Sequence, residues 1–307
     1  MSVGFGSIPD EVIDYVRSVF GVANDKVSKA FTLQPSMHEE GLDHFLIAEL
    51  SAVPPTFLAK SSAAVGIETH WLGGRRMYRR WEIADIAVFI MITMRGKLVA
   101  RKVALLQTKR LYSNELSGPE LEEADFRFGI GRLADRTDNR FPLSTQRTFN
   151  FDAQSKYAML LSESDQVDHI DTYVTQTNIP VYYGLYNPMT VPYTGQIPTT
   201  ITPVLPPQNI IGCRIIPSAD VHRVLAAKIN IDAPSYNDLT FGKPFDPQDG
   251  LSTHGWRIER FIADEVLKCR QGRLFPPTQD MNLNSLLYER SAPITAAIAI
   301  TIDFASD

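Results

Sequence analysis

Two polar side chains end an otherwise apolar segment, "VALLQTKRLY" at residues 103–112. Gln107 and Lys109 are two positions apart, and side chains with that spacing lie on the same face of a β-strand. The amide oxygen of a glutamine can bind a hard cation, and the ammonium of a lysine can stabilise a developing negative charge. The sequence therefore predicts a polar site at the end of this strand.

A carboxylate in the preceding apolar strand is the candidate partner of this pair. Asp85 lies within "WEIADIAVFIMI", and burial of an unpaired charge costs several kcal/mol. In a hairpin with a three-residue loop, 95–97, Asp85 lies directly opposite Gln107 on the same face. A regular two-residue loop places it opposite Leu106, on the other face, so the prediction requires an odd loop or a bulge. Gly96 is compatible with either.

The three side chains together suggest metal-assisted hydrolysis. The carboxylate of Asp85 and the amide oxygen of Gln107 are hard ligands that suit Mg²⁺, an ion that keeps several waters and often shares its site with phosphate. A metal held there can acidify a bound water and polarise a phosphoryl oxygen, while Lys109 orients the water or stabilises negative charge.

This order of residues resembles the PD-(D/E)XK nuclease superfamily, in the QxK form of Mrr-like restriction enzymes and of bacterial anti-phage nucleases. The resemblance covers residues 36–112: a helix with a Glu in "HEEGLDHFLIAEL", an apolar strand with Asp85, a hairpin, and Gln107-Thr108-Lys109. By resemblance the helix ligand is Glu39, which precedes Leu42 by three positions. Glu40 is the alternative.

The resemblance implies a metal-dependent DNA endonuclease that hydrolyses phosphodiester bonds, acting as an effector or subunit of an anti-phage defence system. It implies Glu39, Asp85 and Gln107 as ligands of Mg²⁺ or Mn²⁺, and Lys109 as the residue that stabilises the attacked phosphate. DNA is the expected substrate, with RNA as an alternative, and the expected partner is a protein of the defence complex or a second copy of the chain.

Simpler interpretations exist for each of these residues. Gln107 and Lys109 could mark a strand that emerges into solvent. Glu39 could be a capping-box residue, since it follows Ser36 by three positions. The alternative function is a non-catalytic subunit that has kept the nuclease fold and binds nucleic acid or a protein.

Arginines near the candidate site could bind a phosphate backbone. The net charge of −5 and the pI near 5.7 argue against a protein that is basic overall, so any nucleic-acid surface must be local. The expected contacts are Arg75, Arg76, Arg79, Arg80 and Arg110.

Helical and strand patterns alternate along the chain. Strands are expected at 64–72, 80–94 and 97–109, with helices before and after them. The predicted fold class is α/β, with a restriction-endonuclease-like core, a central mixed sheet flanked by helices, and a C-terminal α+β extension. The expected division is an N-terminal helical segment at 1–35, the nuclease-like core at 36–180, and an extension at 181–307 that continues the sheet or forms a partner surface.

The remaining features favour a soluble protein. No apolar run reaches the roughly 18 residues that a membrane helix needs, and no secretion signal is evident, so we expect a cytoplasmic protein without a membrane contact. Cys213 and Cys269 lack the spacing of a zinc site and are expected to be small core residues.

Overall fold

A computed structural model describes residues 8–72, 83–116, 147–160, 165–197, 211–228, 232–240, 255–275 and 294–305. The helices are α1 (Asp10–Leu33), α2 (Glu39–Ser51), α5 (Asp165–Thr177), α6 (Ser218–Ala226), α7 (Tyr236–Leu239) and α8 (Ile258–Arg260), which continues as a π-helix over Phe261–Val266. The strands are β1 (Thr56–Leu58), β2 (Ala63–Trp71), β3 (Ala84–Met94), β4 (Lys97–Arg110), β5 (Glu115–Leu116), β6 (Arg147–Phe151), β7 (Val181–Tyr186), β8 (Tyr193–Ile197), β9 (Arg214–Pro217), β10 (Trp256–Arg257), β11 (Arg273–Phe275) and β12 (Ile294–Phe304).

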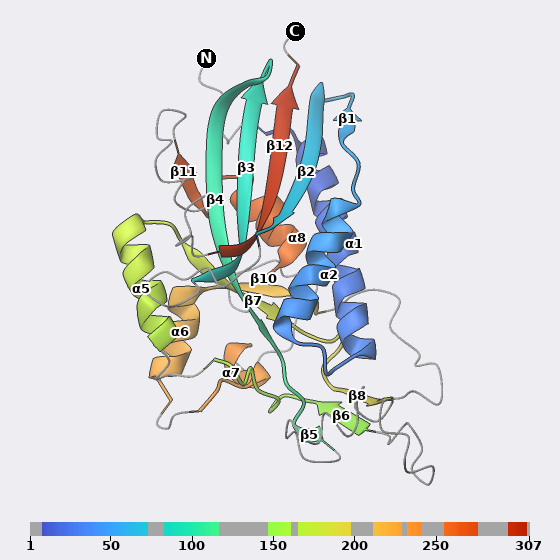
Figure 1. Cartoon of the computed structure of the whole chain (residues 1–307), viewed down its shortest axis with the longest axis vertical. Coiled ribbons are helices and arrows are strands. Elements are labelled where there is room, and N and C mark those ends of the chain that lie inside the picture. The colour runs from blue at the N-terminus through green and yellow to red at the C-terminus, as the bar shows by residue number, and fades with distance from the viewer. Residues whose placement is uncertain are drawn as a thin grey trace.

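A large mixed sheet forms the centre of the molecule (Figure 1). Its strands follow the order β1-β2-β12-β3-β4-β7-β9-β10, and β11 pairs with β4. β3 and β12 are rich in β-branched residues and buried on both faces, as expected of central strands. The α/β class with a mixed sheet flanked by helices is therefore confirmed.

The C-terminal strand does not lie at an edge of this sheet. β12 is inserted between β2 and β3, antiparallel to the first and parallel to the second. The sheet thus contains strands from both sides of residue 180. A smaller sheet, β5-β6-β8, lies at one end of the molecule (Figure 1).

The hairpin between β3 and β4 has a tighter turn than the predicted loop 95–97. Met94 pairs with Lys97, so the turn has two residues, Arg95 and Gly96, and both have a positive φ, of 53° and 70°. Such turns match the right-handed twist of the flanking strands, and glycine adopts this backbone conformation without strain. The expected three-residue loop is therefore wrong.

A β-bulge restores the register that the tight turn would otherwise shift. The pairing moves by one residue after Ile92, which lies opposite Ala100 and leaves Val99 as the extra residue. From there the register continues regularly, and one further step places Asp85 opposite Gln107. Of the two alternatives that the sequence allowed, a bulge or an odd loop, the structure has the bulge.

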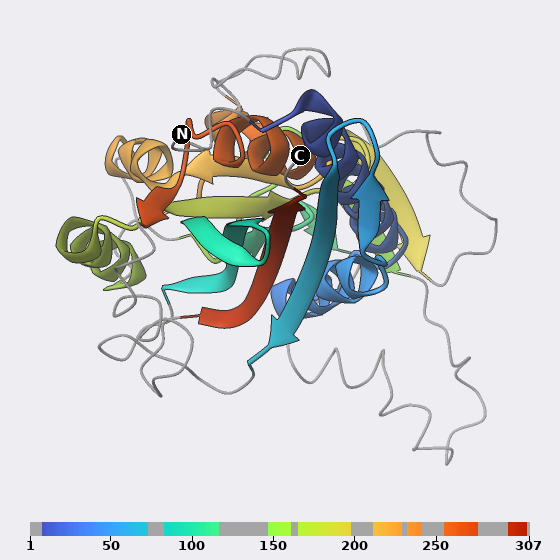
Figure 2. The same ribbon diagram turned by 90° about the horizontal axis from the view of Figure 1, so that it is seen from above.

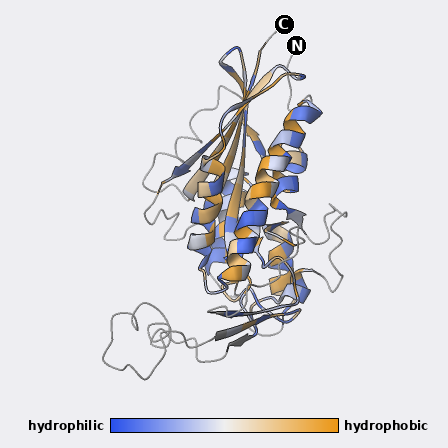
Figure 3. Cartoon of the chain, turned by 90° about the vertical axis from the view of Figure 1, so that its right-hand side faces the viewer, coloured by the Kyte–Doolittle hydropathy of each residue, from blue (hydrophilic) through white to orange (hydrophobic). Residues whose placement is uncertain are grey.

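Helices cover both faces of the sheet. α2 packs against β2 and β4 on one face, with α1 behind it, whereas α6 packs against β7 and β9 on the other. Figures 1 and 2 show α5 and α6 on the side of the molecule opposite α1 and α2. The strands are predominantly hydrophobic and the helices mix hydrophobic and hydrophilic residues (Figure 3), as expected when each helix turns one side to the core.

The starts of several helices differ from the sequence-based expectation. α2 begins at Glu39, with His38 as N-cap and no side-chain cap, so the predicted capping box of Ser36 and Glu39 is wrong. The sequence at 251–272 also predicts one long helix, but the structure has strand β10 at Trp256–Arg257 and helix only from Ile258 to Val266. The sequence also predicts Ser7 as the N-cap of the first helix and a helix at 118–136, and both lie outside the described residues.

A buried amide links the N-terminal helix to the C-terminal half of the chain. Asn24 of α1 is fully buried; its Nδ2 donates to Glu259 Oε2 at 2.9 Å, and its Oδ1 accepts from the backbone N–H of Cys213 at 2.8 Å. Arg257 forms an ion pair with the same Glu259. These contacts fix α1 against the strands and helix around residues 213–260.

We predict that Asn24→Leu lowers the free energy of unfolding by about 2–3 kcal/mol, because it leaves a buried N–H without an acceptor and removes a donor from a buried carboxylate. Urea denaturation measures the change. Val22→Ala is the matched control on the same helix, since Val22 is 53% exposed, and it should change stability by less than about 0.5 kcal/mol. Equal stability of the two variants would contradict the assigned role of Asn24.

Candidate active site

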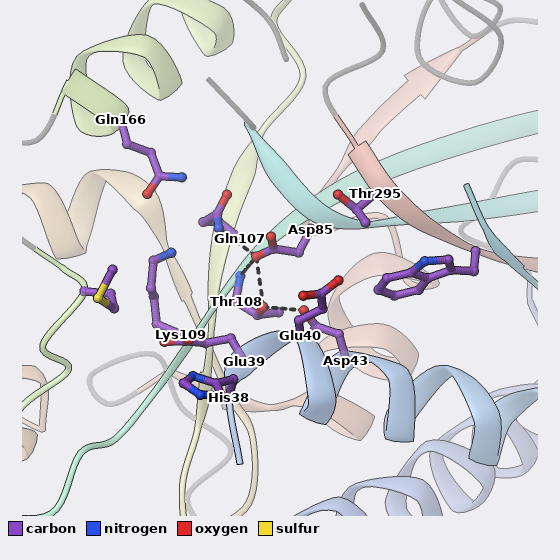
Figure 4. A pocket seen from close by; sticks show the side chains of 12 residues that line it. His38, Glu39, Glu40, Asp43, Asp85, Gln107, Thr108, Lys109, Gln166 and Thr295 are labelled. Atoms are coloured by element: carbon purple, nitrogen blue, oxygen red, sulfur yellow. Dashed lines mark hydrogen bonds between the residues drawn. The ribbon is translucent and has the colours of Figure 1, made fainter. Parts of the chain in front are cut away.

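The predicted residues meet at a pocket where the sheet ends. β2 ends here, β3 and β12 begin here, and the start of α2 lies alongside. The pocket has a volume of about 600 Å³, and most of the residues that line it are polar or charged (Figure 4). Its lining residues are His38, Glu39, Glu40, Asp43, Trp71, Asp85, Gln107, Thr108, Lys109, Met159, Gln166 and Thr295.

Asp85 is the centre of the hydrogen-bond network in this pocket. Its Oδ2 accepts from Gln107 Nε2 at 2.7 Å and from both the backbone N–H and the hydroxyl of Thr108. None of the hydrogen bonds found among the described residues involves Oδ1. The contact between Asp85 and Gln107 is the one that the hairpin register predicted.

Gln107 presents an oxygen that has no partner. Its side chain is 2% exposed, and the bond to Asp85 identifies Nε2 as the atom facing the carboxylate, since a carboxylate accepts and does not donate. Its Oε1 is buried without a hydrogen-bond partner in the part of the chain that the structure describes. Because a buried polar atom without a partner is costly, a bound cation at this oxygen would remove the penalty.

Lys109 follows on the same face of β4 as Gln107. Its side chain is 9% exposed, and within the described ranges its ammonium has no hydrogen bond or ion pair. Its positive charge lowers the pKa of Asp85 and partly offsets burial, which raises that pKa. Asp85 and Lys109 thus lie together on one side of the sheet, as predicted.

The start of α2 supplies the carboxylates on the other side of the pocket. Glu39 is half-buried, and its Oε1 lies 3.4 Å from the backbone N–H of Arg110, whereas Glu40 is exposed. Both line the pocket, so the choice of Glu39 over Glu40 as a ligand stays a prediction.

Arg110 differs from its expected role as a nucleic-acid contact. It is 5% exposed, its guanidinium donates to the carbonyl of Pro35 at 2.7 Å, and it stacks on the ring of Tyr112 at 3.7 Å. The guanidinium of Arg110 therefore makes contacts within the protein and is not presented to a ligand. The other predicted contacts, Arg75, Arg76, Arg79 and Arg80, lie outside the described residues.

Asp43 belongs to the site although the sequence analysis did not select it. It is 3% exposed, with Oδ2 at 2.8 Å from the Thr108 hydroxyl and Oδ1 accepting from the hydroxyl of Tyr186 at 2.7 Å. One feature of the sequence could have identified it. Asp43 precedes Ile47 by four positions and Leu50 by seven, a spacing that places its carboxylate on the buried face of the helix.

A single hydroxyl connects the buried carboxylate of Asp43 to the half-buried carboxylate of Asp85. The Thr108 Oγ1 lies 2.8 Å from Asp43 and 2.9 Å from Asp85, but it carries one hydrogen and can donate to only one of them. A proton on Asp43 would supply the second hydrogen bond. Burial and the negative charge of Asp85 raise the pKa of Asp43 well above its usual range, which favours this arrangement.

The donor atoms fit a hard divalent cation. Asp85, Glu39 and the free amide oxygen of Gln107 are oxygen ligands of the kind that Mg²⁺ and Mn²⁺ prefer. A cluster of three or more His, Cys, Asp or Glu side chains placed to hold a metal is not found among the described residues.

Comparison of the chain with protein-family models, with curated proteins and with solved structures finds no match. The geometry of the pocket is therefore the basis for any functional conclusion. Over the described residues, no helix combines the length and hydrophobicity needed to cross a membrane.

We predict that Asp43→Asn becomes more stable relative to the wild type as the pH rises. The folded protein holds a proton on Asp43 that the unfolded chain releases near pH 4, so this contribution to wild-type stability is lost as the pH increases. The difference between the unfolding free energies should change by up to about 1.4 kcal/mol per pH unit until the folded protein also releases the proton.

Urea denaturation between pH 5 and 8 checks this prediction, and Asp232→Asn is the control. Lys156 lowers the pKa of Asp232, so both its folded and unfolded pKa values lie below pH 5 and its stability difference should be constant over this range. A constant difference for Asp43→Asn as well would mean that Asp43 is ionised in the folded protein.

Proposed function

We propose that this protein is a metal-dependent nuclease, a phosphodiester hydrolase whose preferred substrate is DNA. The observation that carries the proposal is the buried amide oxygen of Gln107, which has no hydrogen-bond partner among the described residues and lies in one pocket with Asp85 and Lys109. A carboxylate, an amide oxygen and an ammonium form a set that suits a divalent cation and a phosphate together.

In this proposal the metal would be held by Asp85, Gln107 and Glu39. A divalent ion bound there would acidify a water and neutralise charge on the phosphate. Lys109 binds a non-bridging phosphate oxygen and stabilises the negative charge that develops as the bond to the leaving oxygen breaks. Thr108 holds Asp85 in place through two hydrogen bonds, and Asp43 fixes the Thr108 hydroxyl from the other side.

The order of the elements supports the PD-(D/E)XK interpretation. A helix that begins with Glu39 precedes a hairpin whose strands bring Asp85 to Gln107 and Lys109, and a parallel strand, β7, follows β4 in the sheet. We therefore extend the proposal to a restriction-endonuclease-like core and, by the same resemblance, to a role as effector or subunit in anti-phage defence, working with a partner protein in the cytoplasm.

A second function is favoured by one observation. Asp85 already accepts three hydrogen bonds from the protein, which satisfies the carboxylate without a metal. A non-catalytic subunit that binds nucleic acid or a protein would use the same fold with this network as a purely structural feature. Incubation of a plasmid with and without Mg²⁺ separates the two, since the binding subunit leaves the plasmid uncut.

Lys109→Met should reduce Mg²⁺-dependent cleavage of a plasmid by about 10²–10³-fold, because it removes the ammonium and keeps the buried side-chain stem. Initial rates of plasmid nicking measure the effect. Lys97→Met, at the exposed hairpin turn, is the matched control and should cleave at the wild-type rate. Wild-type cleavage by the Lys109 variant, with an unchanged urea midpoint, would remove this residue from the mechanism.

Gln107→Met should weaken binding of Mn²⁺ by about 10–100-fold, since it removes the amide oxygen and leaves the volume similar. Electron paramagnetic resonance of free Mn²⁺ in the absence of DNA gives the dissociation constant directly. Gln166→Met, in α5 at the same pocket, is the control and should bind Mn²⁺ as the wild type does. Unchanged affinity in both variants would place the metal elsewhere.

A further inference from the structure

An aromatic side chain shares the pocket with the polar residues. Trp71 is the last residue of β2 and lines the same cavity as Asp85 and Lys109. In the sheet register Trp71 lies opposite Ala296 of β12, which lies opposite Ile86 of β3. Its side chain therefore belongs to the face opposite that of Asp85, and the two reach the pocket from different faces where the strands end.

The indole of Trp71 is held by a second ring. It stacks on the imidazole of His44 from α2, with ring centroids 3.6 Å apart and an angle of 24° between the planes. Its backbone is fixed by pairing with Ala296, and the next residue, Leu72, donates to the carbonyl of Thr295 at 2.9 Å. The plane of the indole is thus set before any ligand binds, which lowers the entropy cost of stacking on it.

The pocket is larger than a phosphate and a metal require. Its volume of about 600 Å³ lies within the range of roughly 300–1,000 Å³ that encloses whole small molecules. Beside the polar residues it contains two largely apolar ones, Trp71 and Met159, and Met159 is 58% exposed. A ligand that fills this space combines a phosphate with a flat, apolar group.

We propose that Trp71 is a stacking platform for one nucleobase of a substrate whose phosphate binds at Lys109 in the same pocket. This inference rests on the proposed nuclease site and specifies its substrate. A base within a duplex is covered on both faces by its neighbours, so only an unpaired or extruded base can stack on an indole inside a pocket. The substrate is therefore a nucleic-acid strand with at least one base outside the duplex stack, and a phosphodiester without a base binds poorly.

Binding to three ligands of equal chain length tests the proposal. Fluorescence anisotropy in EDTA, where no cleavage occurs, gives dissociation constants for a labelled 12-mer of thymidylate, for an abasic 12-mer with the same phosphates, and for the thymidylate strand in a duplex. Trp71→Leu should weaken binding of the single strand by about 5–100-fold. The same change should alter binding of the abasic strand and of the duplex by less than twofold.

Two further variants separate stacking from a general effect on the fold. Trp71→Phe should recover most of the affinity for the single strand, because phenylalanine keeps an aromatic face. Phe57→Leu is the matched control, since Phe57 is an aromatic residue of β1 that is 63% exposed and lies outside the pocket, and it should leave all three constants unchanged.

The outcomes distinguish this inference from the proposed function. Equal loss of affinity for all three ligands, or no loss for any, would overturn the role of Trp71 even if the protein cleaves DNA. Selective loss for the single strand supports the platform. If the wild type then fails to cleave any strand with Mg²⁺, the nuclease proposal is wrong while the base-binding role remains.

Discussion

The pocket depends on the burial of Asp85 at the start of a central strand. An ionised carboxylate in that position needs several donors, and the fold supplies them from one tripeptide, Gln107-Thr108-Lys109, on the neighbouring strand. The amide, the hydroxyl, a backbone N–H and a nearby ammonium all act on the same group. Replacement of any of these groups should change the stability of the ionised Asp85 carboxylate and the positions of the remaining donors.

The alternation of side chains along β4 divides this tripeptide between two layers. Gln107 and Lys109 point to the face covered by α6, and Thr108 points to the face covered by α2, where it meets Asp43. The site therefore contacts the sheet and the helical layers on both of its faces. A buried carboxylate on one face and a half-buried carboxylate on the other are coupled through one hydroxyl, so changes in α2 should be felt at Asp85.

The sequence predicted the contacts within the hairpin. It did not predict the roles of residues whose partners lie far away in the sequence. The strands around Asp85 and Gln107 followed from apolar runs with single polar residues, and their contact followed from the count of residues in the hairpin. The bulge at Val99 could not be distinguished from a longer loop, because both give the same register. Asp43 was missed because its partners, Thr108 and Tyr186, come from strands far away in the sequence, and Arg110 was misassigned because its acceptor is a backbone carbonyl.

The position of β12 has a consequence for the order in which the molecule is built. This strand is translated after β2 and β3 but lies between them, and Thr295 at its start lines the pocket. While the ribosome is still adding residues 294–304, the two neighbouring strands have open edges and the cavity lacks one wall. A nascent polypeptide of this kind would acquire its activity only late in synthesis, and until then its unpaired strands would be natural targets for molecular chaperones.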